Sequence, residues 1–255
     1  MLTMIERSPE ALAFFETIDA ADPSALSACD GWTAHDVAAH VAGIAVEVNR
    51  HLAPHLEGDA VPTTRSFEER EAPLRALDHA ELLRRLEAEE TQMRALVTEA
   101  LAQDPEAVIP WTGRQMAVAT FIAHLRNEHA IHRWDMVGDD EVSVALLGQP
   151  ALTKHSVAVL GEILLRAGRT HDPEPDAPFA ARLHVAGRTD LVVLVDDGVA
   201  LLQWATGASE EPGVVMDAAA RHLFIWGRRP ERPGRIHSSI PQSRLARLQI
   251  LLSGY

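Results

Sequence analysis

The chain has 255 residues, 47% of them hydrophobic and 24% charged, so it is long enough for one large domain or two ordinary ones with real cores. Its 37 acidic and 23 basic residues give a formal net charge of −14, which repels phosphate backbones and excludes nucleic acid as an expected partner. The single cysteine, Cys29, excludes an intramolecular disulfide and a cysteine-rich zinc site, and the lack of a long apolar run predicts a cytoplasmic protein with no membrane partner.

The amino-terminal part of the sequence predicts two capped helices. Ser8 can cap a helix over residues 9–20, whose buried face is expected to carry Leu12, Phe15 and Ile18. Thr33 and Asp36 form a Thr-x-x-Asp capping box that opens a second helix. Apolar residues recur along one face of this second helix: Val37, Val41, Ile44 and Val48.

A loop and three further helices are expected next. Residues 54–66 contain Pro54, Gly58 and Pro62 and therefore predict a loop. Apolar periodicity then predicts helices over residues 78–102, 115–137 and 150–167. The second of these three follows a glycine at position 113 and ends at another at position 138.

The composition changes after this helical region. Residues 171–178 contain three prolines and predict a linker. Short strand-like runs follow at 181–185, 191–195 and 199–204. Helices are expected at 215–227 and 242–252, on either side of a turn rich in proline and glycine. An all-helical first half followed by a small α+β half is the simplest architecture.

Three residues of the helical half form a candidate metal site: His40, Glu128 and His132. Glu128 and His132 are four residues apart on one predicted helix, so their side chains project from one face about 6 Å apart. His40 is on the inner face of its helix. Two imidazoles and one carboxylate suit zinc or a similar divalent ion, and three protein ligands leave positions open for water or substrate, as in a catalytic site. The alternative is an ordinary Glu–His contact and a hydrogen-bonded core histidine.

Helix geometry separates these residues from their neighbours. Glu47 is two turns from His40, about 10 Å along the axis, so it cannot share an ion with His40, although it can line the same cavity. His124 is equally far from His132. Asp135 and Asp36 each lie within a turn of a proposed ligand and can accept an imidazole N–H, although capping already accounts for Asp36.

Other reactive residues give weaker signals. Nothing around Cys29 indicates an activated nucleophile, and the sequence contains neither a Gly-x-Ser-x-Gly motif nor a glycine-rich phosphate loop. Arg228 and Arg229 follow Trp226-Gly227 and suit either an anionic substrate or a solvated helix terminus.

Three motifs resemble one known family. Gly31-Trp32-Thr33, Asp36-Val37 and His40-Val41-Ala42-Gly43 resemble the first motif of the mycothiol-dependent maleylpyruvate isomerase family, part of the wider DinB-like group of metal-binding four-helix bundles. Glu128, His132 and Asp135 resemble its second motif. Leu223-Phe224-Ile225-Trp226-Gly227-Arg228-Arg229-Pro230 resembles the signature of its carboxy-terminal domain, a small α+β module similar to sterol-carrier folds.

This resemblance implies a DinB-like four-helix bundle over residues 1–140 and a small α+β sterol-carrier-like domain over residues 141–255. It implies that His40, Glu128 and His132 hold a divalent metal ion, for which zinc is the first expectation, and that Arg228 is a catalytic residue facing the bundle site. It also implies mycothiol as a co-substrate and a small-molecule substrate. The family is mainly actinobacterial and includes isomerases and S-transferases.

Two other interpretations stay open at this point. In one, the bundle is a non-catalytic, metal-containing module for small-ligand binding or stress response. In the other, it is a metal-free scaffold in which His40 and His132 lie far apart. An enzyme predicts an open coordination position beside a cavity, with Arg228 at its wall.

Overall fold

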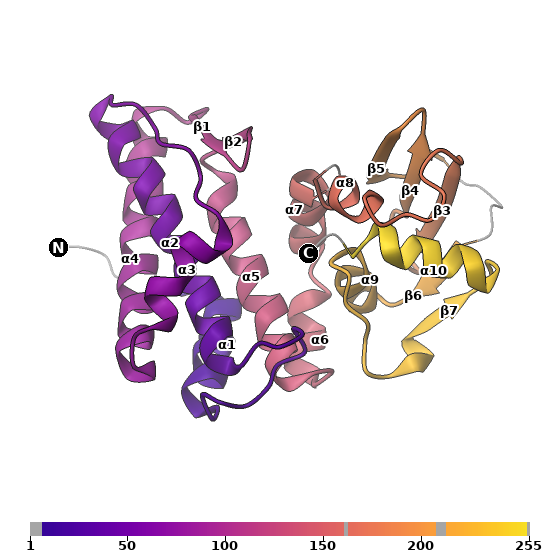
Figure 1. The fold of residues 1–255 in the computed structure, drawn as a ribbon, viewed down its shortest axis with the longest axis horizontal. Coiled ribbons are helices and arrows are strands. Elements are labelled where there is room, and N and C mark those ends of the chain that lie inside the picture. The colour runs from indigo at the N-terminus through magenta and orange to yellow at the C-terminus, as the bar shows by residue number, and fades with distance from the viewer. Residues whose placement is uncertain (1–6, 161–162, 208–212, 254–255) are drawn as a thin grey trace. The chain divides into compact units, whose positions relative to one another are not determined.

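The structure is a computed structural model that describes residues 7–160, 163–207 and 213–253 (Figure 1). The chain divides into two compact units, Met1–Val137 and Gly138–Tyr255.

The first unit is a four-helix bundle, in which α2 packs against α4 and α5, and α1 packs against α5. Its helices are α1 (Pro9–Ala20), α2 (Ala34–Glu57), α4 (His79–Gln103) and α5 (Thr120–Val137). The short helix α3 (Phe67–Arg75) lies against α2. An antiparallel hairpin of β1 (Val108–Trp111) and β2 (Arg114–Ala117) connects α4 to α5.

Helix α1 begins where expected, but its buried face differs from the prediction. The Ser8 hydroxyl accepts a hydrogen bond from the Ala11 amide at 3.2 Å and so caps the helix. Leu12 is 48% exposed, whereas the fully buried residues of α1 include Ala11, Phe14 and Ile18. These three follow the i, i+3, i+7 spacing of one helical face, so the apolar stripe is displaced from the predicted one.

Two boundaries in the first unit were predicted wrongly. Helix α2 continues past Pro54 and is capped at its end by Gly58. This glycine has a left-handed φ of 78°, and its backbone N–H donates a hydrogen bond to the His55 carbonyl. The predicted helix from residue 115 starts only at Thr120, because residues 108–117 form the hairpin. Its two turn residues, Thr112 and Gly113, both have positive φ, as a tight two-residue hairpin requires.

The second unit is a five-stranded sheet with helices. The strand order is β5-β4-β3-β6-β7; β3 and β6 are parallel, and the other neighbours are antiparallel. The strands are β3 (Phe179–His184), β4 (Leu191–Asp196), β5 (Val199–Trp204), β6 (Gly213–Met216) and β7 (Ile236–Ser238). The helices are α6 (Glu141–Leu147), α7 (Pro150–Leu160), α8 (Ile163–Arg169), α9 (Ala218–Ile225) and α10 (Gln242–Leu251), with a 3₁₀ turn at Pro233–Arg235.

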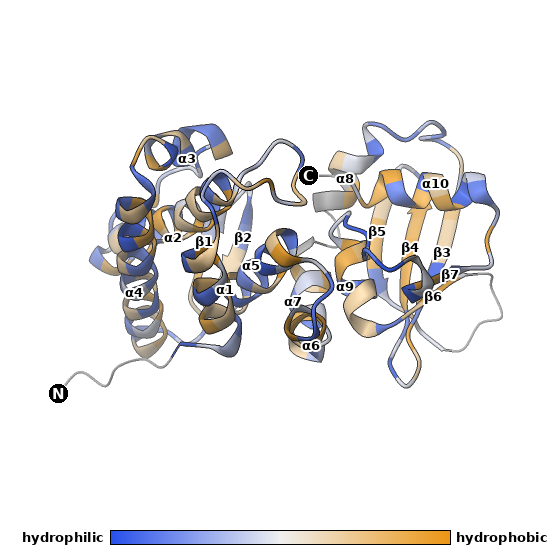
Figure 2. Cartoon of the chain, turned by 90° about the horizontal axis from the view of Figure 1, so that it is seen from below, coloured by the Kyte–Doolittle hydropathy of each residue, from blue (hydrophilic) through white to orange (hydrophobic). Residues whose placement is uncertain are grey.

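The burial patterns of the strands show which of them lie in the core of the second unit. Strand β4 is almost wholly hydrophobic and occupies the middle of the antiparallel β5-β4-β3 group, with residues on both faces buried (Figure 2). Edge strand β5 alternates between buried and exposed residues, and α7 and α8 contact it. The first unit thus carries a helical core, and the second a sheet core.

Two predicted helices in the second unit need correction, whereas residues 171–178 connect α8 to β3 without a helix or strand, as expected of a linker. The helix expected over residues 150–167 is divided into α7 and α8, and residues 161–162 lie outside the described part. The helix expected from residue 215 starts at Ala218, because Asp217 accepts a hydrogen bond from the Ala220 amide and caps it, and because residues 213–216 form β6. The predicted linker 171–178 is anchored by the buried Asp172.

Among the residues that the structure describes, no helix combines the length and the apolar character needed to cross a membrane.

Candidate metal centre

The centre is built on two helices of the first unit, α2 and α5. The Thr33–Asp36 capping box fixes the start of α2: each of the two residues accepts a backbone N–H of the other. Two turns on, His40 lies on the buried face of α2 and is only 6% exposed. The predicted capping role of Asp36 is therefore confirmed, and its carboxylate serves Thr33.

Helix α5 brings Glu128 and His132 to the same place. Each of the two side chains is 4% exposed. Glu128 Oε2 lies 3.6 Å from His40 Nε2 and 3.3 Å from His132 Nε2. One ligand atom from each of the three residues lies within 4.8 Å of those of the other two. The three residues singled out from the sequence thus converge, and the arrangement with His40 and His132 far apart is wrong.

These separations can be compared with those around a metal ion. Zinc binds imidazole nitrogen and carboxylate oxygen at about 2.0–2.1 Å, so two ligands at the tetrahedral angle are about 3.3–3.4 Å apart. The two Nε2–Oε2 distances, 3.6 and 3.3 Å, lie close to this value. The donor set and its spacing therefore fit a zinc-like ion with three protein ligands.

A buried carboxylate lies behind each imidazole. His40 Nδ1 is 2.9 Å from Glu71 Oε1, and His132 Nδ1 is 2.9 Å from Asp135 Oδ2. An Nδ1–H that donates to a carboxylate leaves the Nε2 lone pair for a metal. Asp135 was expected in this role from the sequence, whereas Glu71, which comes from α3, was missed.

Electrostatics at the centre favour a negative Glu128 carboxylate beside a positive His132 imidazole. Burial raises the pKa of Glu128, but hydrogen bonds to His132 and His40 outweigh burial and hold this pKa well below its ordinary value. Burial lowers the pKa of His132, but Asp135, Cys29 and Glu128 together raise it well above its ordinary value. A protonated His132 donates from both ring nitrogens, and its Nε2 can exchange that proton for a metal ion.

Aromatic side chains surround the imidazoles. The Trp32 ring stacks on the His132 ring, with centroids 6.2 Å apart, and lies 5.1 Å from the His40 ring. Phe67, from α3, lies 5.7 Å from His40 and is 54% exposed. His124 Nε2 lies 3.6 Å from the second oxygen of Glu128. The two imidazoles are therefore bordered by aromatic rings as well as by polar groups.

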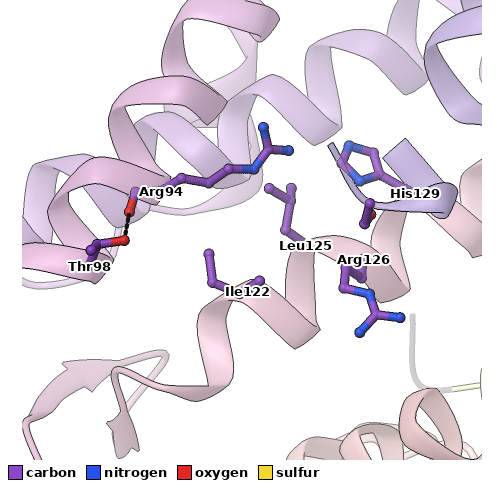
Figure 3. Close-up of a pocket in the computed structure, with 7 residues that line it drawn as sticks. Arg94, Thr98, Ile122, Leu125, Arg126 and His129 are labelled. Atoms are coloured by element: carbon purple, nitrogen blue, oxygen red, sulfur yellow. Dashed lines mark hydrogen bonds between the residues drawn. The ribbon is translucent and has the colours of Figure 1, made fainter. Parts of the chain in front are cut away.

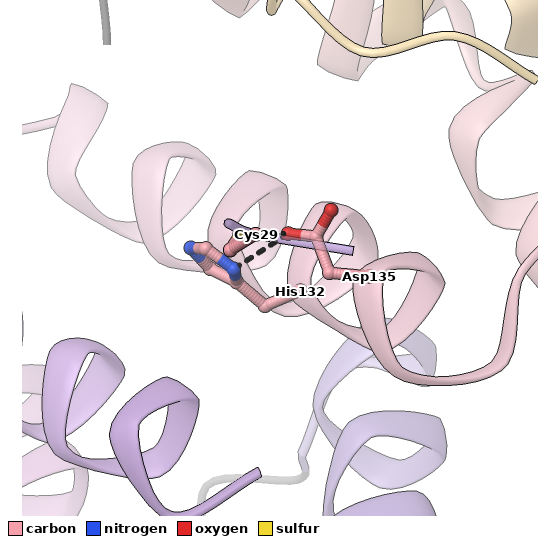
Figure 4. Close-up of side chains that lie close together, drawn as sticks. All are labelled: Cys29, His132 and Asp135. Carbon is pink, nitrogen blue, oxygen red and sulfur yellow. Dashed lines mark hydrogen bonds and ion pairs between the residues drawn. The ribbon is translucent and has the colours of Figure 1, made fainter. Parts of the chain in front are cut away.

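Cys29 lies on the far side of His132 from Glu128. Its thiol donates to Asp135 Oδ2 at 3.2 Å. Figure 4 shows the Cys29, His132 and Asp135 side chains close together, with the His132–Asp135 interaction drawn as a dashed line. These three residues also offer ligand atoms within 4.8 Å of one another, so Cys29 borders the candidate centre through His132 and Asp135.

Glu47 does not line the metal centre. It is fully buried, and its carboxylate binds Arg50 and Arg65. Burial raises its pKa, but hydrogen bonds from these two arginines lower it to about 2. Its role is to hold the chain that leads into α3.

A separate hollow of about 150 Å³ lies along another face of α5 (Figure 3). Its lining residues are Ser8, Arg94, Thr98, Ile122, Leu125, Arg126 and His129. His129 Nε2 is 2.6 Å from Glu90 Oε1, and Arg126 pairs with Glu10. Both of these basic side chains are paired with carboxylates of other helices, so their contacts are explained by the packing of the bundle.

Arg228 belongs to the second unit and follows α9. Its guanidinium donates to the Trp226 carbonyl at 3.2 Å, and its own amide binds the Leu223 carbonyl. Gly227 has a φ of +73°, and a Cβ there would lie 2.9 Å from the Leu252 carbonyl oxygen. The Trp-Gly-Arg motif thus forms the end of α9 and presents a half-buried arginine after it.

Taken together, the fold and the site define a DinB-like helical bundle joined to a small α+β domain. The family model described as the Mycothiol maleylpyruvate isomerase N-terminal domain matches residues 8–137. The chain therefore belongs to the mycothiol-dependent maleylpyruvate isomerase family.

Solved structures show the same fold across both units. The crystal structure of a mycothiol-dependent maleylpyruvate isomerase matches with a TM-score of 0.64 and 15% identity, over 91% of each chain. A structure of a histidine-to-alanine mutant of such an isomerase matches with a TM-score of 0.58 and 16% identity, also over 91% of each chain. No curated protein matches the sequence. The predicted fold class and family resemblance are confirmed.

Proposed function

We propose that this protein is a metal-dependent and thiol-dependent enzyme that acts on a small electrophilic substrate by isomerisation or S-transfer. The observation that carries the proposal is the convergence of the buried His40, Glu128 and His132, whose two Nε2–Oε2 distances are close to those of ligands on one tetrahedral ion. The carboxylate behind each imidazole supports the proposal, because a histidine that binds a metal usually donates its other ring N–H to a carboxylate, a backbone carbonyl or water.

In this proposal His40, Glu128 and His132 hold one divalent ion, zinc in the first instance. When bound, the ion lowers the pKa of a thiol or water beside it and acts as a Lewis acid. Geometry and availability, more than ligand type, decide between zinc and nickel, iron or manganese.

The chain's own residues supply orientation and exclusion of water. Glu71 and Asp135 keep the Nε2 atoms of the two histidines directed at one point. Trp32 and Phe67 form an apolar wall against His40, which limits the water around a bound thiolate. Arg228 is the residue we assign to stabilise negative charge that develops on the substrate, because guanidinium binds planar oxyanions in a bidentate manner.

The co-substrate we propose is mycothiol, because the solved structures that share this fold are described as mycothiol-dependent. In an isomerisation, the thiolate sulfur would form a C–S bond with one carbon of an activated cis double bond. The π electron pair of that double bond would move to the substrate carbonyl oxygen and form an enolate. Rotation about the new single bond and elimination of the thiolate return the trans product. In an S-transfer, the thiolate displaces a leaving group and stays attached. A reduced, cytoplasmic setting suits such thiol chemistry.

Metal content tests the proposal. Elemental mass spectrometry on the purified protein should find about one divalent ion per chain, as for a single three-ligand site. The His40→Ala/His132→Ala double variant should lose it, while a control double variant, His55→Ala/His171→Ala, should retain it. Circular dichroism should show that both variants keep their helices.

The outcomes separate the interpretations. A wild-type protein that holds no metal and takes up no added zinc contradicts the proposal. A metal-loaded protein that converts no electrophilic substrate with mycothiol supports the non-catalytic binding module instead. Thiol-dependent turnover that disappears in the His40→Ala/His132→Ala variant supports the enzyme.

A further inference from the structure

Helix α3 approaches α2 unusually closely at Gly43. A Cβ built on Gly43 would lie 2.9 Å from Glu71 Cγ and 3.4 Å from Arg70 Cγ. Glycine within a helix costs about 1 kcal/mol relative to alanine. Side chains of α3 occupy the space that a side chain at position 43 would need, so the glycine allows the two helices to pack closely.

The start of α3 is held to the same face of α2. Glu47 accepts hydrogen bonds from the Arg65 amide at 2.7 Å and from Arg65 Nε at 2.8 Å. Ser66 then caps α3, forming a capping box with the third residue of that helix. Glu47 is four residues beyond Gly43 and seven beyond His40, so all three lie on one face of α2. This face therefore carries the proposed ligand, the glycine that α3 approaches and the carboxylate that binds Arg65.

This docking places the Glu71 carboxylate against His40. Glu71 is 1% exposed, and its Oε1 lies 2.9 Å from His40 Nδ1. Arg75 donates to its other oxygen at 3.1 Å, and Arg70 Nε lies 3.4 Å from Oε1. Arg75 therefore holds one carboxylate oxygen, and the other oxygen faces both Arg70 and the His40 imidazole.

We propose that Glu71 is a positioning residue for the metal centre, and that the approach of α3 at Gly43 sets its contact with His40. Glu71 accepts the Nδ1–H of His40, which fixes the ring orientation and leaves Nε2 directed at the ion. This inference rests on the proposed function, because it assumes that His40 is a metal ligand.

A structural explanation competes with this one. In it, Glu71 is merely a buried ion-pair partner that ties α3 to α2 through Arg70 and Arg75. Removing it would then lower the stability of the fold and leave the intrinsic metal affinity of the folded centre unchanged. Metal affinity and stability of the metal-free protein must therefore be measured separately.

The experiment is a zinc competition titration against a chromophoric chelator, using the full chain. Glu71→Gln keeps the shape but removes the charge, and we expect it to bind zinc about 10–100-fold more weakly than wild type. Gly43→Ala moves Glu71 without changing its chemistry and should weaken binding in the same direction. Glu68→Gln, on the same helix with its side chain 78% exposed, is the matched control and should bind like wild type.

Thermal unfolding of the metal-free variants completes the test. If Glu71→Gln binds zinc within about twofold of wild type, Glu71 does not position the ligand and the proposal is overturned, whatever the change in stability. If Glu71→Gln loses affinity but Gly43→Ala does not, the part assigned to the close approach is wrong. A wild-type protein that binds no zinc overturns the proposed function itself, a result that none of the Glu71 variants can produce.

Discussion

Replacing Glu47 with glutamine should destabilise the first unit in a pH-dependent manner. Glu47 is fully buried, and its carboxylate accepts hydrogen bonds from Arg50 and from the Arg65 side chain and backbone. Burial raises its pKa, but these bonds lower it from an ordinary 4.5 to about 2. Glutamine has nearly the same shape and cannot carry the charge.

The size of the effect follows from the shift in pKa. The fall from 4.5 to about 2 corresponds to about 3 kcal/mol, because each pKa unit is worth about 1.4 kcal/mol. The side chains of Arg50 and Arg65 are 31% and 32% exposed, so solvent screens part of the attraction. We therefore expect Glu47→Gln to lower the free energy of unfolding by about 2 kcal/mol at neutral pH.

The sign of the pH dependence is fixed. Because the folded pKa of Glu47 is lower than the unfolded one, its contribution is complete above about pH 5 and is lost as the pH falls towards about 2. The difference between wild type and Glu47→Gln should thus shrink to less than half at about pH 3. Urea unfolding of the metal-free protein measures this difference when it is monitored by hydrogen exchange at the backbone amides of α2, which reports on the first unit.

Glu99→Gln, an exposed change on α4, serves as the control and should stay within about 0.5 kcal/mol of wild type. A Glu47→Gln effect that is equally large at about pH 7 and about pH 3 would refute the reasoning, because a lost shape or packing contact does not titrate.

Three further changes have expected outcomes. Asp172→Ala removes the buried charge partner that Arg247 binds through Nε and Nη2 at 2.9 and 3.0 Å and leaves Arg247 with the exposed Glu174 carboxylate at 3.6 Å, so thermal unfolding should show a loss of about 3 kcal/mol. Gly227→Ala forces a side chain into a φ of +73° and against the Leu252 carbonyl, and should cost about 2 kcal/mol in urea unfolding. Arg228→Ala should reduce thiol-dependent turnover by about 100-fold or more while zinc content stays unchanged, and a loss of zinc would contradict its assigned role.

Much of the fold was predictable because local signals agree with the packing. The Thr33–Asp36 capping box, the strand runs around 191–204 and the carboxy-terminal helix all appear as expected. The errors lie where tertiary contacts override local preference. The hairpin over residues 108–117 has no alternating apolar pattern, and residues 213–216 become a strand only because they pair with β3 and β7.

The candidate site was only partly predictable for a similar reason. Glu128 and His132 lie one turn apart on a single helix, so their proximity follows from helix geometry. That His40 joins them depends on how α2 packs against α5, which spacing does not encode; the family motifs supplied that link. Glu71 could not be found this way, because its partner is 31 residues away. Gly43 was the only local signal, since a mid-helix glycine indicates a close neighbour.

The position of α3 connects stability to the proposed chemistry. Glu47 binds the chain just before α3, Gly43 allows α3 to pack closely against α2, and Glu71 of α3 contacts His40. A change at Glu47 should therefore act on the metal centre although its carboxylate never approaches the ion. If zinc affinity falls in Glu47→Gln as well as in Glu71→Gln, the placement of α3 controls the centre. If zinc affinity falls only in Glu71→Gln, the Glu71 carboxylate contacts His40 without the help of the Glu47–Arg65 contact, and Glu47 contributes to stability alone.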